Sequence, residues 1–355
     1  MDLNEENIEK CLYASFNQDS SCFCIGTNKG FRIYNSFPLK CHIKREIQGG
    51  VGIIEVLNRT NFFIFVGTGN NPKLSQQKII LWDENKSKVI KELILLYDIK
   101  NIKIKRTKIF AICERKIIVF TLGNFEKIDS IETFPNKNGI FGISLDPDLY
   151  IISYLSKDIG KIKIKNYNEK KDEKYLIKEI SAHQSEIVAL TMNYEGTLIA
   201  SVSEKGTLIK IFRIKDSCLI QELRRGTEPA EIYSLNFDLK SLYISCSSNK
   251  GTIHIFNIIN KENINEKHNQ KSIFGTVVSY FGIKNEYLNS EWSFAQYRIN
   301  CKDKSIVSFC TENNYVVVIT YDGIYHQGSF NPKAGGDCNN ILEENFLEME
   351  IEKED

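Results

Sequence analysis

The sequence lacks the residue patterns that mark metal sites, disulfide frameworks and common catalytic centres. Its ten cysteines include no Cys-x-x-Cys pair, and neither Cys-x-x-His nor His-Glu-x-x-His spacing occurs. Gly-x-Ser-x-Gly and Gly-x4-Gly-Lys motifs are also missing. We therefore expect a non-enzymatic protein without a metal or cofactor, whose cysteines are reduced and buried as small hydrophobic residues.

The sequence also lacks an excess of charge and a long apolar run. It has 46 Lys and Arg residues against 45 Asp and Glu, a net charge of +1. This balance disfavours nucleic acid as a partner, so any anion site must come from a local cluster. No apolar run approaches the ~20 residues that span a bilayer, and the start of the chain is acidic rather than a secretory signal. We expect a cytoplasmic protein that contacts membranes only peripherally.

Short β-rich runs repeat along the chain and predict an all-β fold. Each unit contains an alternating strand with an aromatic or β-branched core, and these strands are spaced by 48, 38, 45, 47, 44 and 70 residues. Five of the six spacings match the ~40–50 residues of a four-stranded propeller blade. We predict a seven-bladed β-propeller with degenerate WD-like repeats. The central residues of the predicted third strands are Ile33, Leu81, Val119, Ile164, Ile211, Ile255 and Tyr325.

The long sixth spacing predicts an insertion in blade 6, at about residues 258–297. The propeller is expected to occupy residues 1–342 as one domain, with its last strand near 338–342. Residues 343–355 are then an acidic C-terminal tail. Only Trp82-Asp83 matches the Trp-Asp dipeptide of typical WD repeats, so a divergent WD-like protein-interaction scaffold is an alternative.

Two adjacent arginines, Arg224 and Arg225, lie at the junction of blades 5 and 6. Successive side chains of an extended chain point to opposite sides. The pair therefore predicts two separate anion sites, with Arg224 facing blade 5 and Arg225 facing blade 6. Arginine suits phosphate because its planar fork donates paired hydrogen bonds and stays charged. The alternative is a surface pair bonded to the carboxylates of Glu222 or Glu228.

Polar side chains on the flanking strands resemble each other on the two blades. Each set combines hydroxyl donors, lysine and histidine, the groups that a phosphorylated inositol ring requires. Either histidine could instead have a purely structural role. The first candidate site comprises His183, Ser201, Ser203, Lys205, Thr207, Lys210 and Arg224. The second candidate site comprises Arg225, Ser247, Ser248, Lys250, Thr252 and His254.

Three segments carry a family resemblance. These are residues 200–212, the Leu-Arg-Arg-Gly motif at 223–226, and residues 247–256. Together they resemble the PROPPIN family, the autophagy-related phosphoinositide-binding propellers called WIPI proteins in animals, whose signature is Phe/Leu-Arg-Arg-Gly. The resemblance continues through Val66-Gly-Thr-Gly69, Ala295 and Gly335-Gly-Asp-Cys338, and so covers nearly the whole chain.

The resemblance implies binding of phosphatidylinositol 3-phosphate and the 3,5-bisphosphate, without a choice between them. It implies a first headgroup site at His183, Ser203, Thr207, Lys210 and Arg224. It implies a second headgroup site at Arg225, Ser247, Thr252 and His254. Relatives often have arginine where this chain has Lys210, and lysine lacks the fork. A monomeric protein on phagophore, endosomal, vacuolar or similar membranes is then expected.

The blade 6 insertion contains an apolar segment, residues 272–282. Its apolar residues recur on one face of a helix, although glycines and β-branched residues make it a poor helix in water. It either packs on the propeller or enters a membrane as an interfacial segment, and the resemblance implies the latter. The residues predicted to insert are Ile273, Phe274, Val277, Val278, Tyr280 and Phe281.

The blade 2 loop, residues 69–78, is long and polar. In relatives the corresponding loop helps to bind an autophagy lipid-transfer protein. Pro72 and Lys73 are the candidate contact residues here, and an ordinary solvated loop is the alternative.

Overall fold

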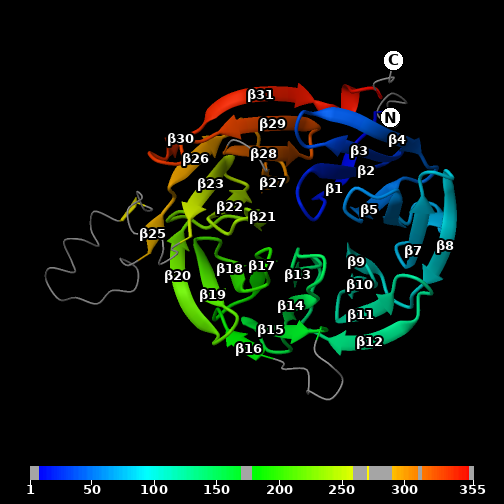
Figure 1. The fold of residues 1–355 in the computed structure, drawn as a ribbon, viewed down its shortest axis with the longest axis horizontal. Coiled ribbons are helices and arrows are strands. Elements are labelled where there is room, and N and C mark those ends of the chain that lie inside the picture. The colour runs from blue at the N-terminus through cyan, green and yellow to red at the C-terminus, as the bar shows by residue number, and fades with distance from the viewer. Residues whose placement is uncertain (1–7, 169–177, 259–269, 272–289, 311–313, 352–355) are drawn as a thin grey trace, which may run out of the picture. The chain divides into compact units, whose positions relative to one another are not determined.

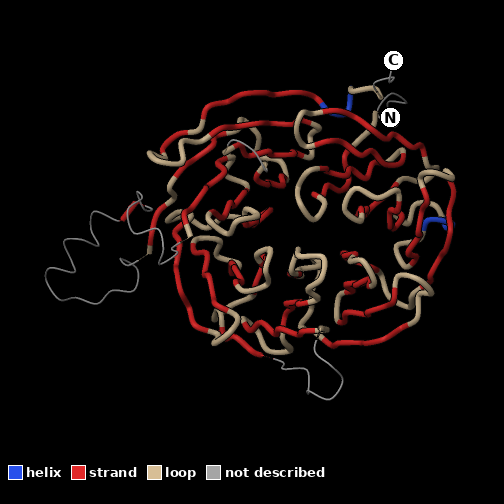
Figure 2. The backbone as a smooth tube through the Cα atoms, in the orientation of Figure 1, coloured by secondary structure: helices blue, strands red, loops and turns tan. Residues whose placement is uncertain are grey.

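The computed structural model describes residues 8–168, 178–258, 270–271, 290–310 and 314–351. Strands dominate these residues, as Figures 1 and 2 show. The helical elements among them are two short 3-10 turns, η2 (Pro72–Leu74) and η4 (Phe346–Glu348). In the same residues, no helix has the length and apolarity needed to cross a membrane. The predicted all-β class is confirmed.

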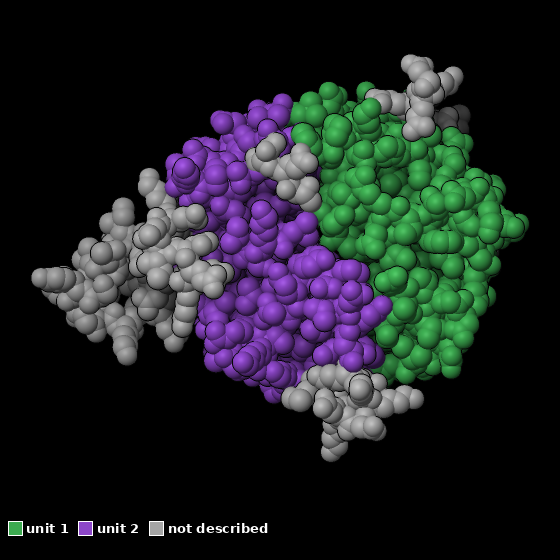
Figure 3. Space-filling view, viewed as in Figure 1, with its two compact units in different colours: residues 1–139, 319–326, 342–355 green, residues 140–318, 327–341 purple. Residues whose placement is uncertain are grey.

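The chain forms two compact units, which Figure 3 colours separately. Unit 1 contains residues 1–139, 319–326 and 342–355, and unit 2 contains residues 140–318 and 327–341.

Three four-stranded antiparallel sheets, blades 1 to 3, lie in unit 1. Blade 1 is β1 (Cys11–Phe16), β2 (Cys22–Thr27), β3 (Gly30–Asn35) and β4 (Lys40–Glu46). Blade 2 is β5 (Val51–Val56), β6 (Phe62–Gly67), β7 (Lys78–Asp83) and β8 (Lys88–Ile94). Blade 3 is β9 (Ile99–Ile104), β10 (Lys108–Cys113), β11 (Lys116–Thr121) and β12 (Lys127–Glu132).

Blades 4 to 6 lie in unit 2. Blade 4 is β13 (Gly142–Ile143), β14 (Ile151–Leu155), β15 (Lys161–Asn166) and β16 (Lys178–Ser181). Blade 5 is β17 (Ile187–Met192), β18 (Leu198–Ser203), β19 (Leu208–Arg213) and β20 (Cys218–Arg224). Blade 6 is β21 (Ile232–Phe237), β22 (Tyr243–Ser248), β23 (Thr252–Asn257) and β26 (Ala295–Arg298), with β30 (Gly336–Asp337) added parallel to β26.

Blade 7 is built entirely from strands late in the chain. It contains β27 (Ser305–Phe309), β28 (Tyr315–Thr320), β29 (Ile324–Ser329) and β31 (Asn339–Asn345). Each predicted third strand is the third strand of its sheet: β3, β7, β11, β15, β19, β23 and β29. The fold is therefore a seven-bladed β-propeller, as predicted.

The outer strand of blade 7 extends beyond the predicted boundary at residue 342. β31 continues to Asn345, and the next residue, Phe346, is fully buried. The Tyr34 hydroxyl donates to the Phe346 carbonyl at 2.8 Å, and Lys44 pairs with Glu350 at 2.8 Å. Residues 343–351 thus pack on blade 1, because a buried aromatic anchors a segment whose composition alone suggested a free tail.

The blade 6 insertion lies between β23 and β26 and ends before Ala295. Its described residues include two short strands, β24 (Gln270–Lys271) and β25 (Glu291–Trp292). β25 pairs in parallel with the end of β20, joining Leu223 to Glu291 and Arg224 to Trp292. The end of the insertion is thereby attached to blade 5.

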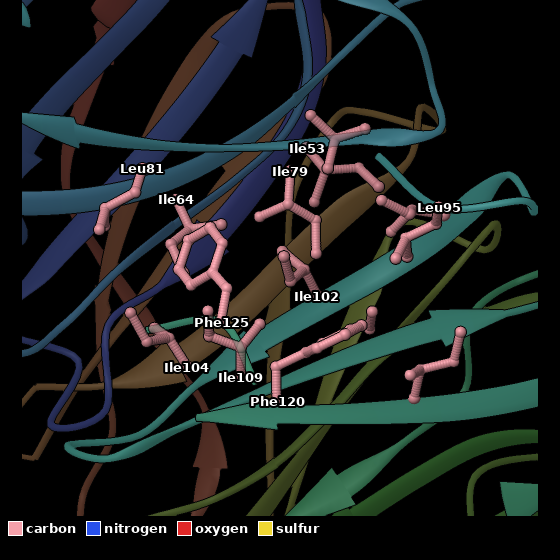
Figure 4. Packing of buried hydrophobic residues seen from close by; sticks show 14 of the residues in the cluster. Ile53, Ile64, Ile79, Leu81, Leu95, Ile102, Ile104, Ile109, Phe120 and Phe125 are labelled. Atoms are coloured by element: carbon pink, nitrogen blue, oxygen red, sulfur yellow. The ribbon is translucent and has the colours of Figure 1, made fainter. Parts of the chain in front are cut away.

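Apolar faces of neighbouring blades pack against each other within each unit. In unit 1, branched residues of blades 2 and 3 meet around Ile64, Ile79 and Ile102 (Figure 4). In unit 2, Ile209 and Leu223 of blade 5 pack with blade 6 residues. The alternation of side chains then leaves the opposite face of blade 5, which carries polar groups, directed away from blade 6.

Candidate functional site

Arg224 and Arg225 lie on opposite faces of blade 5. Arg224 ends β20 and is opposite Leu208 of β19, while the Arg225 amide donates to the Thr207 carbonyl at 2.9 Å. Leu223 packs toward blade 6, so Arg225, two residues later, lies on that side and Arg224 on the other. The two guanidinium groups therefore belong to different surroundings.

The Arg224 face of blade 5 collects most of the first candidate set. Ser201, Lys210 and Glu222 are directly opposite one another across β18, β19 and β20. The His183 ring nitrogen Nε2 lies 2.9 Å from the Ser201 hydroxyl. Burial, reinforced by the charge of Lys210, lowers the pKa of His183 to about 4, so the ring is neutral near pH 7.

The other three members of the first set differ in burial or in the face that they share. Ser203 is half-buried at the end of β18, two residues from Ser201 and on the same face. Lys205 is exposed in the turn between β18 and β19. Thr207 lies beside Arg225 rather than Arg224, since its carbonyl accepts the Arg225 amide.

Arg225 is a buried cation held by neutral groups. It is 5% exposed, its Nε donates to the Gly206 carbonyl at 2.9 Å, and its Nη2 donates to the Glu228 carbonyl. No carboxylate in the described residues lies within ion-pair distance of Arg225; the Glu228 carboxylate pairs instead with Lys250 at 3.1 Å. Burial lowers the pKa of the Arg225 guanidinium. Among the described residues, the alternative ion pair between Arg225 and a neighbouring carboxylate is therefore not formed.

The carbonyl of Gly206 accepts the hydrogen bond from Arg225 Nε. Its φ of +63° is in the left-handed region, and an added Cβ would lie 1.9 Å from the Ala230 carbonyl oxygen. A side chain cannot be accommodated without moving backbone. The glycine of the Lys-Gly-Thr turn in blade 5 is thus needed to place the carbonyl that Arg225 contacts.

Blade 6 supplies the other side of the second candidate set. His254 and Cys246 are directly opposite on β23 and β22, and Ser248 and Thr252 share their face. Burial, together with the charge of Arg225, lowers the pKa of His254 to about 4. Ser247 lies on the opposite face, where its hydroxyl donates to the Ser305 carbonyl at 2.9 Å. The structure therefore brings Ser248, Thr252 and His254 to the Arg225 side, but not Ser247.

Two serines near the end of the insertion contact the candidate sites, one serine at each site. Arg224 Nε donates to the Ser290 hydroxyl at 2.7 Å, and His254 Nδ1 lies 3.3 Å from the Ser293 hydroxyl. The two serines are 2% and 3% exposed. No local pattern marks them, because they are 66 and 39 residues from the side chains they contact.

The predicted membrane-inserting residues lie outside the described residues: Ile273, Phe274, Val277, Val278, Tyr280 and Phe281. Phe294, at the end of the insertion, is described and is 3% exposed in a cluster with blade 6 and 7 residues. It therefore belongs to the core.

The candidate partner loop is ordered by its own capping contacts. Pro72 and Lys73 lie in η2, where the Asn71 side chain accepts the Lys73 amide at 3.0 Å. Lys73 is exposed and Leu74 is buried. Thr68, which precedes the loop, and Gln76 within it help to line a pocket of about 280 Å³ in unit 1.

Comparisons with known proteins agree with this architecture. A family model described as PROPPIN matches residues 10–347. Autophagy-related protein 18 of Dictyostelium discoideum is 30% identical over 346 residues, covering 93% of this chain and 91% of the relative. Autophagy-related protein 18e of Arabidopsis thaliana is 29% identical over 347 residues, covering 96% and 89%.

Solved structures show the same fold. Kluyveromyces lactis Hsv2 with its complete loop 6CD superimposes with a TM-score of 0.77, at 22% identity, covering 96% of this chain and 100% of that chain. A structure titled as a complex of KlAtg21 with the coiled-coil of AgAtg16 gives a TM-score of 0.74, at 21% identity, covering 95% and 99%. With a propeller of seven blades, a Leu-Arg-Arg-Gly motif between blades 5 and 6, and a family match over nearly its whole length, this chain belongs to the PROPPIN family of autophagy-related phosphoinositide-binding propellers.

Proposed function

We propose that this chain is a peripheral membrane protein that binds phosphatidylinositol 3-phosphate and the 3,5-bisphosphate through two sites. The observation that carries the proposal is Arg225, a buried guanidinium whose described partners are carbonyl oxygens. A buried cation without a carboxylate is costly, and a bound phosphate would supply the missing charge. The neutral His254 beside it adds a polar group that can take up a proton when an anion arrives.

Gly226 supports an approach of a ligand to the arginine pair. No described atom lies within 4 Å of where its Cβ would be, and its φ is outside the left-handed region. Neither strain nor packing among the described residues therefore requires glycine there. Close approach of a headgroup to the backbone is a reason for glycine at this position.

We propose that the first site uses His183, Ser201, Ser203, Lys205, Lys210 and Arg224, and that Thr207 contributes to the second. The second site would also use Arg225, Ser248, Lys250, Thr252 and His254, with Ser247 acting indirectly from the far face of β22. The insertion would enter the bilayer with the apolar residues between 273 and 281. Two weak headgroup contacts and an apolar anchor raise one another's effective concentration at a membrane.

Recruitment of protein partners is part of this proposal. A structural neighbour is titled as a complex with a coiled-coil, which supports protein binding by this fold. In unit 1, exposed Lys73 and the pocket between Thr68 and Gln76 offer a contact surface near η2. We propose that Pro72 and Lys73 help to bind an autophagy lipid-transfer protein, with the chain acting as a monomeric recognition module rather than an enzyme. Its locations would be phagophore, endosomal or vacuolar membranes.

Co-flotation with liposomes tests the proposal. Vesicles containing phosphatidylinositol 3-phosphate, the 3,5-bisphosphate or unphosphorylated phosphatidylinositol are compared for the wild type and an Arg224→Thr/Arg225→Thr variant. We expect wild-type flotation only with the phosphorylated lipids, and loss in the variant of more than roughly a hundredfold in apparent affinity, since both sites of a bivalent contact are removed.

A matched control is Arg213→Thr, which removes an exposed arginine paired with Asp216 on the same blade. It should float like the wild type. Flotation that ignores the lipid phosphate in folded wild-type protein would instead favour the WD-like scaffold without lipid specificity.

A further inference from the structure

A four-residue strap, defined here as Ser290–Ser293, touches a key side chain of each candidate headgroup site. Its first residue accepts a hydrogen bond from Arg224 Nε at 2.7 Å, and its last lies 3.3 Å from His254 Nδ1. Both hydroxyls are buried. The contacts made by the strap thus span the surroundings of both arginines.

The strap is attached to blade 5 at one end and blade 6 at the other. Its middle residues form β25, which pairs in parallel with β20, and Gln221 Nε2 donates to Glu291 at 2.7 Å. The residue after the strap, Phe294, donates its amide to the Ile255 carbonyl of β23 at 2.8 Å. The two end residues of the strap are buried and its two middle residues are half-buried. A short segment fixed at both ends in this way transmits a displacement from one end to the other.

The chemistry of the two hydroxyls makes them responsive to an anion. Arg224 Nε can only donate, so the Ser290 hydroxyl oxygen is the acceptor of that hydrogen bond. Ser293 Oγ also accepts from Gln296 Nε2 at 3.0 Å, which leaves its proton for the neutral His254 ring or for a ligand. A phosphate oxygen that reaches either site would either accept a hydrogen bond from a strap hydroxyl or displace that hydroxyl from Arg224 or His254.

We propose that the strap couples the two headgroup sites, so that occupation of one changes the affinity of the other. This inference rests on the proposed function. Ser290 and Ser293 are positioning residues: Ser290 orients Arg224, Ser293 orients His254, and the backbone between them carries the coupling. The two sites are then a linked pair rather than two independent contacts that share a membrane.

Calorimetric titration of the full chain with soluble inositol 1,3-bisphosphate tests the coupling without membrane avidity. An Arg225→Thr background isolates the first site, and an Arg224→Thr background isolates the second. We expect Ser293→Ala to weaken the first site, and Ser290→Ala to weaken the second, by roughly two- to tenfold, the range for one lost hydrogen bond. Ser245→Ala, a buried serine whose hydroxyl donates to the Asn236 carbonyl, should change either site less than about twofold. The proposal would be overturned if Ser290→Ala changed the affinity of the first site alone and Ser293→Ala changed the affinity of the second site alone.

A ligand-free measurement separates this proposal from the proposed function. The chain has five histidines, which makes side-chain assignment by NMR practicable. Ser290→Ala should move the His254 resonances although Ser290 contacts Arg224, while those of His326 in blade 7 should stay in place. Unchanged His254 resonances would refute the coupling. A wild type that does not bind inositol 1,3-bisphosphate would refute the proposed function and leave this second result to decide the strap.

Discussion

Arg32 of blade 1 and Arg225 between blades 5 and 6 are buried to the same extent but have opposite surroundings. They are 3% and 5% exposed. Arg32 donates Nε to Glu9 at 3.2 Å and Nη1 to the Met349 carbonyl at 3.0 Å. Burial alone would lower the pKa of Arg32, but the hydrogen bond to Glu9 and the charges around it raise that pKa above its ordinary value. Burial lowers the pKa of Arg225, which has carbonyl partners.

The contrast distinguishes two uses of a buried arginine. Arg32 has its counter-charge within the chain and serves the fold. Arg225 has hydrogen-bond acceptors but no carboxylate within ion-pair distance among the described residues. A buried cation of the second kind is expected to attract an anion from outside.

The largest expected difference is in stability. Arg32→Met should lower the free energy of unfolding by about 3–4 kcal/mol, since it leaves the partly buried Glu9 without its partner. Arg225→Met should change it by less than about 1 kcal/mol, because the lost hydrogen bonds are offset by removal of a desolvated charge. Urea unfolding followed by tryptophan fluorescence measures both. Equal losses in the two variants would break the comparison.

The second largest expected difference is in how much a bound ligand stabilises variants of the two arginines. Inositol 1,3-bisphosphate at about a hundred times its dissociation constant should stabilise the wild type by about 2.7 kcal/mol per site. Thermal unfolding should show this gain in Arg32→Lys, which keeps a cation near Glu9, and should show about half of it in Arg225→Thr. A full gain in Arg225→Thr would mean that the ligand binds elsewhere.

Acidification should weaken the folded state through His183 and His254. Both have folded pKa values of about 4, below the ordinary value of about 6.5, so the unfolded chain binds more protons between these limits. Their stabilising contribution is complete above about pH 6.5 and is lost as the pH falls toward 4. We expect a loss of about 2.7 kcal/mol between pH 7.5 and 5.5, about half of it from each histidine. His183→Asn/His254→Asn should flatten this dependence, and an unaltered slope would assign it to other groups.

The smallest expected effect concerns Lys210. Its ammonium lies 4.0 Å from Glu222, whereas arginine would offer a planar fork to a phosphate. Lys210→Arg should tighten the first site by roughly two- to fivefold in an Arg225→Thr background. Calorimetry with inositol 1,3-bisphosphate measures the change, and weaker binding would indicate that Glu222 captures the fork.

Strand periodicity was sufficient to predict the propeller because each blade repeats the same alternation. β15 shows why: Ile162 and Ile164 are buried while Lys163 between them is partly exposed. Such a pattern depends only on neighbours in sequence. The end of blade 7 could not be predicted in this way, since the acidic composition after residue 342 hides the buried anchor Phe346.

The candidate sites show a similar limit. Alternation predicted the separation of Arg224 from Arg225, but residue type alone grouped Ser247 and Thr207 with side chains that lie on other faces. Ser290 and Ser293 could not be found at all from the sequence, because their contacts depend on how a long insertion returns to the fold.

The contacts of Phe346 and Met349 with blade 1 also bear on how the chain folds during synthesis. Tyr34 and Arg32 find these partners 312 and 317 residues later in the sequence. At 5–20 residues per second, a ribosome needs about 15 to 60 s to deliver them. Through that interval a nascent blade 1 has an aromatic ring and a cation that lack these final partners. We expect a chain that ends a few residues before Phe346 to lack both contacts and to have a less stable blade 1.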